Sequence, residues 1–156
     1  MDTGIILDSD DFVRLGAEFA TVMGPFSAQA EYISTSVNRD GASDLDFDGW
    51  YVEMAYFLTG ESRQYKHGKF AKPLPQSNVG EGGMGAWQLA LRYSTLDLSD
   101  GLIEGGEVDT MTLGLNWFPT PTLRFTANYV DVLDVDGGPN DGLESSVLQL
   151  RSQWAF

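Results

Sequence analysis

The sequence predicts an all-β fold of antiparallel strands that belong to a transmembrane β-barrel, and three observations carry this prediction. Apolar and polar residues alternate with a period of two wherever the chain is not loop, which is typical of β-strands. No segment of helical length has a sustained apolar period of about 3.6 residues. The polar faces of the strands mix small residues with arginine, glutamate and amides but contain no lysine, which fits a polar barrel interior behind an apolar exterior.

Each strand is identified by its alternation and is bounded by a turn or loop signal. The predicted strands cover residues 11–22, 26–32, 50–59, 87–94, 110–117, 123–129 and 147–156. The connections between them are a Gly-Pro turn at 23–25, a polar loop over 38–46, an irregular stretch over 60–84, a loop over 97–106, a Pro-Thr-Pro turn at 119–121 and a loop over 134–143.

Composition excludes several classes of protein. The 156 residues make one domain, and 42% of them are apolar, which is too many for a disordered acidic chain. A net charge of -14 opposes nucleic-acid binding, so no nucleic-acid partner is expected. The absence of cysteine excludes disulfide scaffolds and thiolate metal sites. No apolar run approaches the roughly 18 residues of a spanning helix.

No enzyme chemistry and no cofactor are expected. His67, the single histidine, has no nucleophile motif around it. Residues 80–85 match the glycine fingerprint of dinucleotide-binding proteins, but a strand follows where that fingerprint needs a helix. No spacing typical of metal ligands is present, so no metal site is expected.

Strand parity assigns the two ends of the sheet. If the C-terminus is periplasmic, the two tight turns are periplasmic and the three loops are extracellular, as in bacterial outer-membrane barrels. The loops and their edges gather acidic residues opposed only by Arg39: Asp40, Asp44, Asp46, Asp48, Asp97, Asp100, Glu104, Glu107, Asp131, Asp134, Asp136, Asp141 and Glu144. Solvated loops are the main interpretation, with divalent-cation binding near lipopolysaccharide as the alternative.

Two sets of basic residues stand out by their position. A periplasmic cluster, Arg63, Lys66, Lys69 and Lys72, contains every lysine of the chain, and Arg14, Arg92, Arg124 and Arg151 lie on the predicted lumen-facing side of their strands. Guanidinium groups there could contact an anion through paired hydrogen bonds, or they could neutralise the wall carboxylates Glu18, Glu31 and Glu53. The basic segment could equally be a solvated loop.

Several strand motifs together resemble a known family. They are the Trp50–Glu53 strand running into Phe57–Glu61, the Gly-Ala-Trp and Arg-Tyr-Ser motifs of residues 85–94, the hairpin over 113–125 and the terminal phenylalanine. From about residue 11 to 156 the sequence resembles the C-terminal part of the phosphate-selective porins O and P.

The resemblance implies a sixteen-stranded outer-membrane barrel, of which residues 1–156 would be the C-terminal part of a single domain with about seven strands. It further implies a homotrimer, passive diffusion of phosphate, polyphosphate or other small anions, and a role in anion exit for the basic cluster. Residues 1–8 lack the basic and apolar parts of a secretory signal, which agrees with the expectation of missing N-terminal strands.

The last strand also matches the signal that outer-membrane proteins present to their assembly machinery. Leu148, Leu150, Trp154 and Phe156 alternate as that signal requires, with Ser152 as a gap. Lipid and lipopolysaccharide of the bacterial outer membrane are therefore further expected partners.

Two alternatives to the anion channel stay open at this point. One is a small barrel of eight strands, with residues 1–9 as the eighth, in a structural or adhesion role. The other is a soluble β-sandwich binding module, such as a carbohydrate binder.

Overall fold

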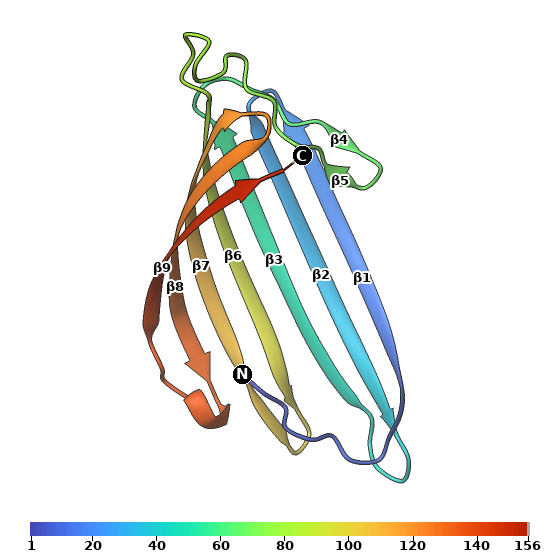
Figure 1. Cartoon of the computed structure of the whole chain (residues 1–156). Helices are drawn as coiled ribbons and strands as arrows, with labels where there is room; N and C mark the ends of the chain where they lie inside the picture. The colour runs from blue at the N-terminus through green and yellow to red at the C-terminus, as the bar shows by residue number, and fades with distance from the viewer. Residues whose placement is uncertain (156) are drawn as a thin grey trace.

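One large antiparallel sheet makes up most of the chain in the computed structural model, which describes residues 1–155 apart from the side chain of Pro139 (Figure 1). The strands are β1 (Ser9–Met23), β2 (Phe26–Arg39), β3 (Leu45–Phe57), β6 (Ala86–Asp100), β7 (Ile103–Thr120), β8 (Leu123–Asp136) and β9 (Ser145–Trp154), in this spatial order. A separate hairpin pairs β4 (Tyr65–Lys66) with β5 (Lys69–Phe70), and η1 (Gly138–Asn140) is a single 3-10 turn.

The prediction of seven antiparallel strands is confirmed, and consecutive strands of the large sheet are neighbours throughout. The sheet curves, with β8 and β9 bending out of the plane of β1–β3 (Figure 1). Within residues 1–155 it does not close, because β1 and β9 each pair on one side only. Within residues 1–155, no helix is long and apolar enough to span a membrane.

The strands extend further than the alternation predicts, and the predicted loop over 97–106 is wrong. β6 and β7 continue to a two-residue turn at Gly101 and Leu102. Ladder hydrogen bonds use the backbone, so polar side chains do not prevent pairing. Ser99 supports the irregular end of this ladder, because its hydroxyl accepts a hydrogen bond from the Gly106 amide at 2.9 Å.

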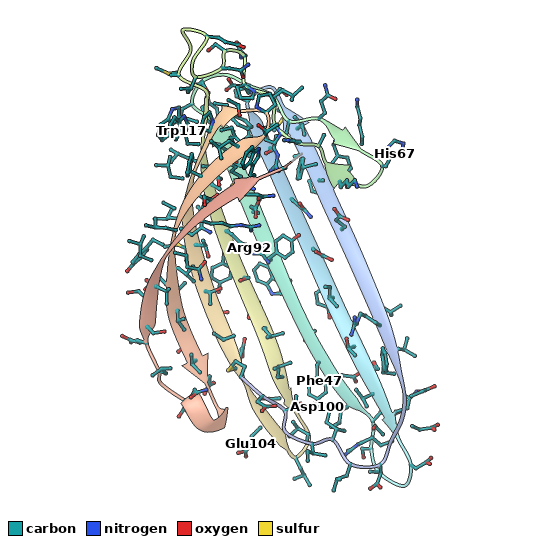
Figure 2. The ribbon with its side chains drawn as sticks, in the orientation of Figure 1. Phe47, His67, Arg92, Asp100, Glu104 and Trp117 are labelled. Carbon is teal, nitrogen blue, oxygen red and sulfur yellow. The ribbon has the colours of Figure 1, made fainter. Side chains whose placement is uncertain are left out.

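The two tight turns at residues 24–25 and 121–122 lie at one end of the sheet, and the turn at 101–102 lies at the other. Connection length therefore separates the two ends less clearly than the sequence predicts. We name them by composition: the lysine end holds the connection over residues 58–85, and the acidic end holds the connections over 40–44, 101–102 and 137–144. Figure 2 places His67 at the lysine end and Asp100 at the acidic end.

Register makes each face of the sheet continuous across all seven strands. On the polar face Gln29 pairs with Glu53, and Glu53 pairs with Arg92. On the apolar face Leu89 pairs with Leu115. Since side chains alternate along every strand, this register keeps polar and apolar residues on opposite sides. The apolar face is open, with Leu150 77% exposed.

The buried residues are few and lie mainly where strands meet connections. At the lysine end Phe57, Ala86 and Phe118 form a buried cluster, with the Phe57 and Phe118 rings 6.1 Å apart. Gly85 approaches β7 so closely that a Cβ atom there would lie 2.5 Å from the carbonyl oxygen of Phe118, and its φ of 73° also favours glycine. This contact sets where the long connection rejoins the sheet.

Candidate functional site

The polar face of β1, β2 and β3 is held by a hydrogen-bonded row of side chains. The Gln29 amide donates to the Glu18 carboxylate at 3.2 Å and to the Tyr51 hydroxyl at 2.8 Å. Neighbouring strands place these groups side by side because their registers match. The row fixes the position of an acidic group on the face predicted to line a lumen.

The four candidate arginines Arg14, Arg92, Arg124 and Arg151 all lie on this polar face. Arg92 stacks on Tyr51, with its guanidinium carbon 3.7 Å from the ring centroid, and Arg14 lies 5.8 Å from the Phe12 centroid. Such stacking leaves the edge of a guanidinium free for an anion. Within residues 1–155, none of the four forms an ion pair with a wall carboxylate, although Glu53 attracts Arg124 at longer range.

Charge is unevenly distributed along the sheet. Carboxylates of the polar face lie on β1–β3 (Glu18, Glu31 and Glu53), whereas three of the four arginines lie on β6–β9 (Arg92, Arg124 and Arg151). Arg92 and Glu53 are cross-strand neighbours at the boundary between the two sectors. One side of the polar face is therefore mainly basic and the other mainly acidic.

Asn116 is the centre of a buried network on β6, β7 and β8. Its side-chain oxygen accepts hydrogen bonds from Arg124 Nε at 3.2 Å, Arg124 Nη2 at 2.8 Å and Thr126 Oγ1 at 2.9 Å. Its amide nitrogen donates to Gln88 Oε1 at 3.1 Å. Asn116 thus orients Arg124 through a neutral acceptor, and within residues 1–155 no carboxylate forms an ion pair with this arginine. The sequence analysis missed this role, which depends on the register of three strands.

The basic segment, residues 63–72, contacts the large sheet. The Tyr65 hydroxyl donates to Glu18 on β1 at 3.2 Å, and Arg63 lies over the Phe70 ring at 4.5 Å from its centroid. Burial lowers the pKa of Arg63, repulsion by Arg124 lowers it further, and attraction by Glu53 opposes both. The hairpin of β4 and β5 lies beside the ends of β1 and β2 (Figure 1).

The structure separates the four members of the predicted cluster. Lys66 and Lys69 pair across the exposed tip of the β4–β5 hairpin, on either side of His67 (Figure 2). Arg63 and Lys72 lie instead in one pocket with Arg124. Sequence proximity therefore groups residues that the fold divides between an exposed tip and a partly enclosed site.

Glu61 anchors the start of this connection, a role that the sequence analysis missed. It is 4% exposed and accepts hydrogen bonds from the Thr59 hydroxyl and from the Gln76 amide, the latter at 3.2 Å. Thr59 also accepts a hydrogen bond from the Trp87 amide at 3.0 Å. A buried carboxylate needs such donors, and the only sequence signal was an acid directly after the turn residue Gly60.

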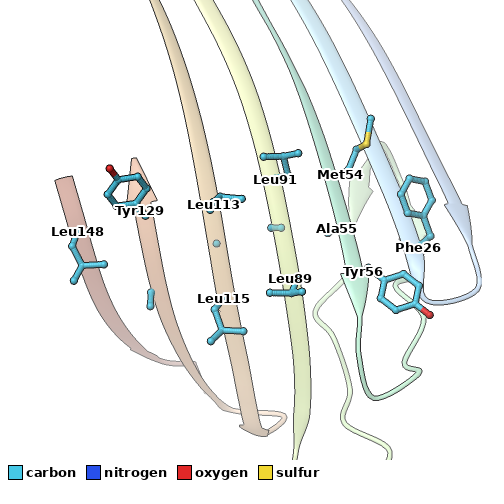
Figure 3. A pocket seen from close by; sticks show the side chains of 13 residues that line it. Phe26, Met54, Ala55, Tyr56, Leu89, Leu91, Leu113, Leu115, Tyr129 and Leu148 are labelled. Carbon is cyan, nitrogen blue, oxygen red and sulfur yellow. The ribbon is translucent and has the colours of Figure 1, made fainter. Parts of the chain in front are cut away.

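Aromatic rings gather on the apolar face at the lysine end. Trp117 stacks between Trp87 and Phe125, with centroid distances of 5.3 and 5.5 Å, and its indole nitrogen donates to the Met84 carbonyl at 2.9 Å. An apolar ring with one bonded polar atom suits a membrane interface. Farther along this face, leucines line a shallow hollow of about 500 Å³ (Figure 3).

The candidate assembly residues lie on the apolar face of the edge strand β9. Leu148, Leu150 and Trp154 are 68%, 77% and 71% exposed, and Ser152 interrupts their row. Phe156 lies outside the described residues. Recognition of this strand by an assembly machinery stays a prediction.

At the acidic end, several carboxylates accept hydrogen bonds from the ends of neighbouring strands. Asp46 accepts from Ser36, Asp11 accepts from Asn38, and Asp100 accepts from the Asp46 amide at 2.7 Å. Among residues 1–155, no three acidic or histidine side chains lie close enough together to hold a metal ion.

Comparison with known proteins identifies the family. The model of the family described as phosphate-selective porin O and P matches residues 1–156. The chain belongs to this porin family. It is 35% identical over 144 residues to Porin O of Pseudomonas aeruginosa, a match that covers 81% of this chain and 32% of that protein. It is 38% identical over 132 residues to an uncharacterized protein of Caulobacter vibrioides, covering 85% of this chain and 27% of that protein.

Family membership confirms the resemblance seen in the strand motifs, and it places the chain in the bacterial outer membrane. The chain spans about a third or less of the length of these relatives. The open sheet agrees with part of a barrel wall, since among the described residues neither β1 nor β9 is paired on its outer side.

Proposed function

We propose that this chain forms the C-terminal part of an outer-membrane porin that passes small anions, including phosphate or polyphosphate, by passive diffusion. The observation that carries the proposal is the division of one sheet into an apolar face and a face bearing four arginines without ion pairs among residues 1–155. An apolar face of this kind suits lipid, and arginines on the opposite face suit anions in water. A channel of this type carries out no enzymatic reaction.

Further strands complete the barrel in this proposal. Unpaired backbone groups at β1 and β9 cannot face lipid, so each edge needs a partner strand within the longer protein. Family resemblance favours sixteen strands, a homotrimer, contact with lipopolysaccharide and insertion by the assembly machinery.

The two alternatives fit the described chain less well. An eight-stranded barrel needs a strand within residues 1–9, yet residues 1–8 contain no strand. A β-sandwich needs a second large sheet to cover the apolar face, and over residues 1–155 the other sheet is the two-residue-per-strand hairpin of β4 and β5.

The direct test is reconstitution of the full-length protein in planar bilayers, with reversal potentials recorded in a salt gradient with and without phosphate. We expect an anion-selective current that phosphate reduces. A cation-selective current would contradict anion transport and would point to a general pore governed by the acidic loops. Absence of current from correctly folded protein would contradict the channel itself.

A further inference from the structure

A pocket of about 290 Å³ lies at the lysine end, where the basic segment meets the beginning of β8 and the end of β9. Its volume is just below the range of roughly 300–1,000 Å³ typical of small-molecule sites, so only a small ligand fits. Arg63, Lys72 and Arg124 provide its basic lining, and Phe70, Phe118 and Leu123 provide much of its apolar lining. The pocket is thus amphipathic and cationic.

The positive charge of this pocket is not balanced by its own lining. None of the described residues that line it is acidic. Glu53 acts on Arg63 electrostatically without forming an ion pair with it. Arg63 and Arg124 also repel each other, and Glu53, which lies outside the lining, attracts both of them.

Hydrogen bonding in the pocket is likewise incomplete. Arg63 Nε is buried and has no hydrogen-bond partner within residues 1–155. Arg124 directs Nε and Nη2 to the neutral Asn116 oxygen, which leaves its Nη1 group for another acceptor. Aromatic rings hold both guanidiniums, at 4.5 Å over Phe70 for Arg63 and 5.3 Å over Phe118 for Arg124. These cations are therefore positioned but only partly satisfied.

The chemistry of the lining defines the ligand. Three cations favour a dianion over a monoanion, and a phosphate monoester carries a charge of about -1.5 to -2 at neutral pH. Guanidinium groups bind its oxygens in pairs, and the adjacent rings and Leu123 favour an apolar substituent over water. Inorganic phosphate would leave that apolar half of the pocket uncovered.

We propose that this pocket binds small phosphate monoesters that carry an apolar group, such as an aryl phosphate. This inference deepens the proposed function, on which it rests, because it gives the anion pathway a site selective for organic phosphates at the lysine end. Arg63, Lys72 and Arg124 bind the phosphate, and the apolar lining contacts the substituent.

Calorimetric titration of the folded, detergent-solubilised full-length protein tests the proposal independently of conduction. The probes are phenyl phosphate, methyl phosphate and benzoate. We expect phenyl phosphate to bind roughly tenfold or more tightly than methyl phosphate, because burial of its ring adds to the same phosphate contacts. Equal binding of the two phosphates would overturn the apolar half of the proposal, and benzoate binding as tightly as phenyl phosphate would overturn the preference for phosphate.

A matched pair of lysine variants locates the site. Lys72→Gln removes a charge from the pocket and should weaken phenyl phosphate binding by roughly fivefold to tenfold, whereas Lys69→Gln removes the same charge from the exposed hairpin tip and should change it less than twofold. Equal losses in both variants would indicate a diffuse electrostatic effect and overturn the site.

Bilayer recordings on the same preparation separate this inference from the proposed function. A protein that conducts anions but binds phenyl phosphate no better than methyl phosphate contradicts the pocket and leaves the channel intact. A protein that binds phenyl phosphate through Lys72 but passes no current contradicts the channel and leaves the pocket intact.

Discussion

Thr112 and Leu113 are consecutive residues of β7, yet their side chains meet different surroundings. Thr112 is the cross-strand neighbour of Arg92 on the polar face, whereas Leu113 lies between Leu91 and Tyr129 on the apolar face and is 50% exposed. The polar face bonds its groups to one another in rows and networks of side chains, whereas the apolar face carries mainly leucines and rings with few polar atoms. The comparison indicates that side chains on the two faces of the same strand are suited to two different solvents, water on the polar face and lipid on the apolar face.

The largest expected effect comes from placing one charge on each face. Leu113→Arg should lower the free energy of unfolding in lipid vesicles by about 2–4 kcal/mol, because the charge must enter hydrocarbon. Thr112→Arg, its matched control, should cost less than about 1 kcal/mol because water lines that side. Urea titrations of the full-length protein measure both values. Equal costs would show that the two faces do not have different solvents.

The polar face is tested next through its buried hydrogen-bond centre. Asn116→Leu deprives Arg124, Thr126 and Gln88 of a partner and should cost about 1–3 kcal/mol of unfolding free energy. Asn128→Leu makes the same change on the same face at a side chain that forms no hydrogen bond within residues 1–155, and it should stay within about 0.5 kcal/mol. A similar loss in both variants would contradict a special role for Asn116.

The apolar face has its own specific contacts in the ring stack at the lysine end. Trp117→Leu removes two stacked pairs and the hydrogen bond to the Met84 carbonyl, so a loss of about 1–3 kcal/mol is expected. Trp50→Leu removes the single tilted pair with Tyr93 and should cost about 0.5–1.5 kcal/mol. The same urea titration ranks them, and a larger loss for Trp50→Leu would contradict the stack.

The smallest effect at neutral pH concerns the contact that fastens the hairpin to the polar face. Desolvation and the charge and hydrogen bond of Glu18 raise the pKa of Tyr65 above its ordinary value of 10.0. A raised pKa means that the contact stabilises the fold below about pH 10 and is lost as pH rises through the higher folded value. The ultraviolet absorbance titration of Tyr65→Phe, subtracted from that of the wild type, should isolate the ionisation of Tyr65. A midpoint at or below pH 10.0 would contradict the raised pKa.

The alternation of residues was sufficient to predict the seven strands and the division between the faces. It failed at strand ends, because Asp97 and Asp134 are typical of loops, whereas their backbones continue the ladder of neighbouring strands. Alternation also did not predict that Phe47, which lies on the otherwise polar face at the acidic end, is buried in an apolar patch and only 9% exposed. Pairing between strands, and not local preference, decides these positions.

Candidate charges were easier to find than their arrangement. The arginines of the polar face could be assigned from parity alone, since residue spacing determines the face. The division of Lys69 from Lys72 and the support of Arg124 by Asn116 depend on how a long connection folds back against β8 and on the register of three strands. No spacing in one sequence encodes those contacts.

The long connection over residues 58–85 begins and ends at the same place. The Leu58 amide donates to the Trp87 carbonyl at 2.8 Å, and Gly85 lies against Phe118. The first and last residues of the connection are therefore held close together at the end of the sheet. An insert closed at its base transmits little of its own length to the sheet, and the entropy of a loop rises only slowly with its size. The barrel wall could therefore accept shorter, longer or foreign segments at this point, which makes the connection a natural position for grafting new binding specificities into the wall.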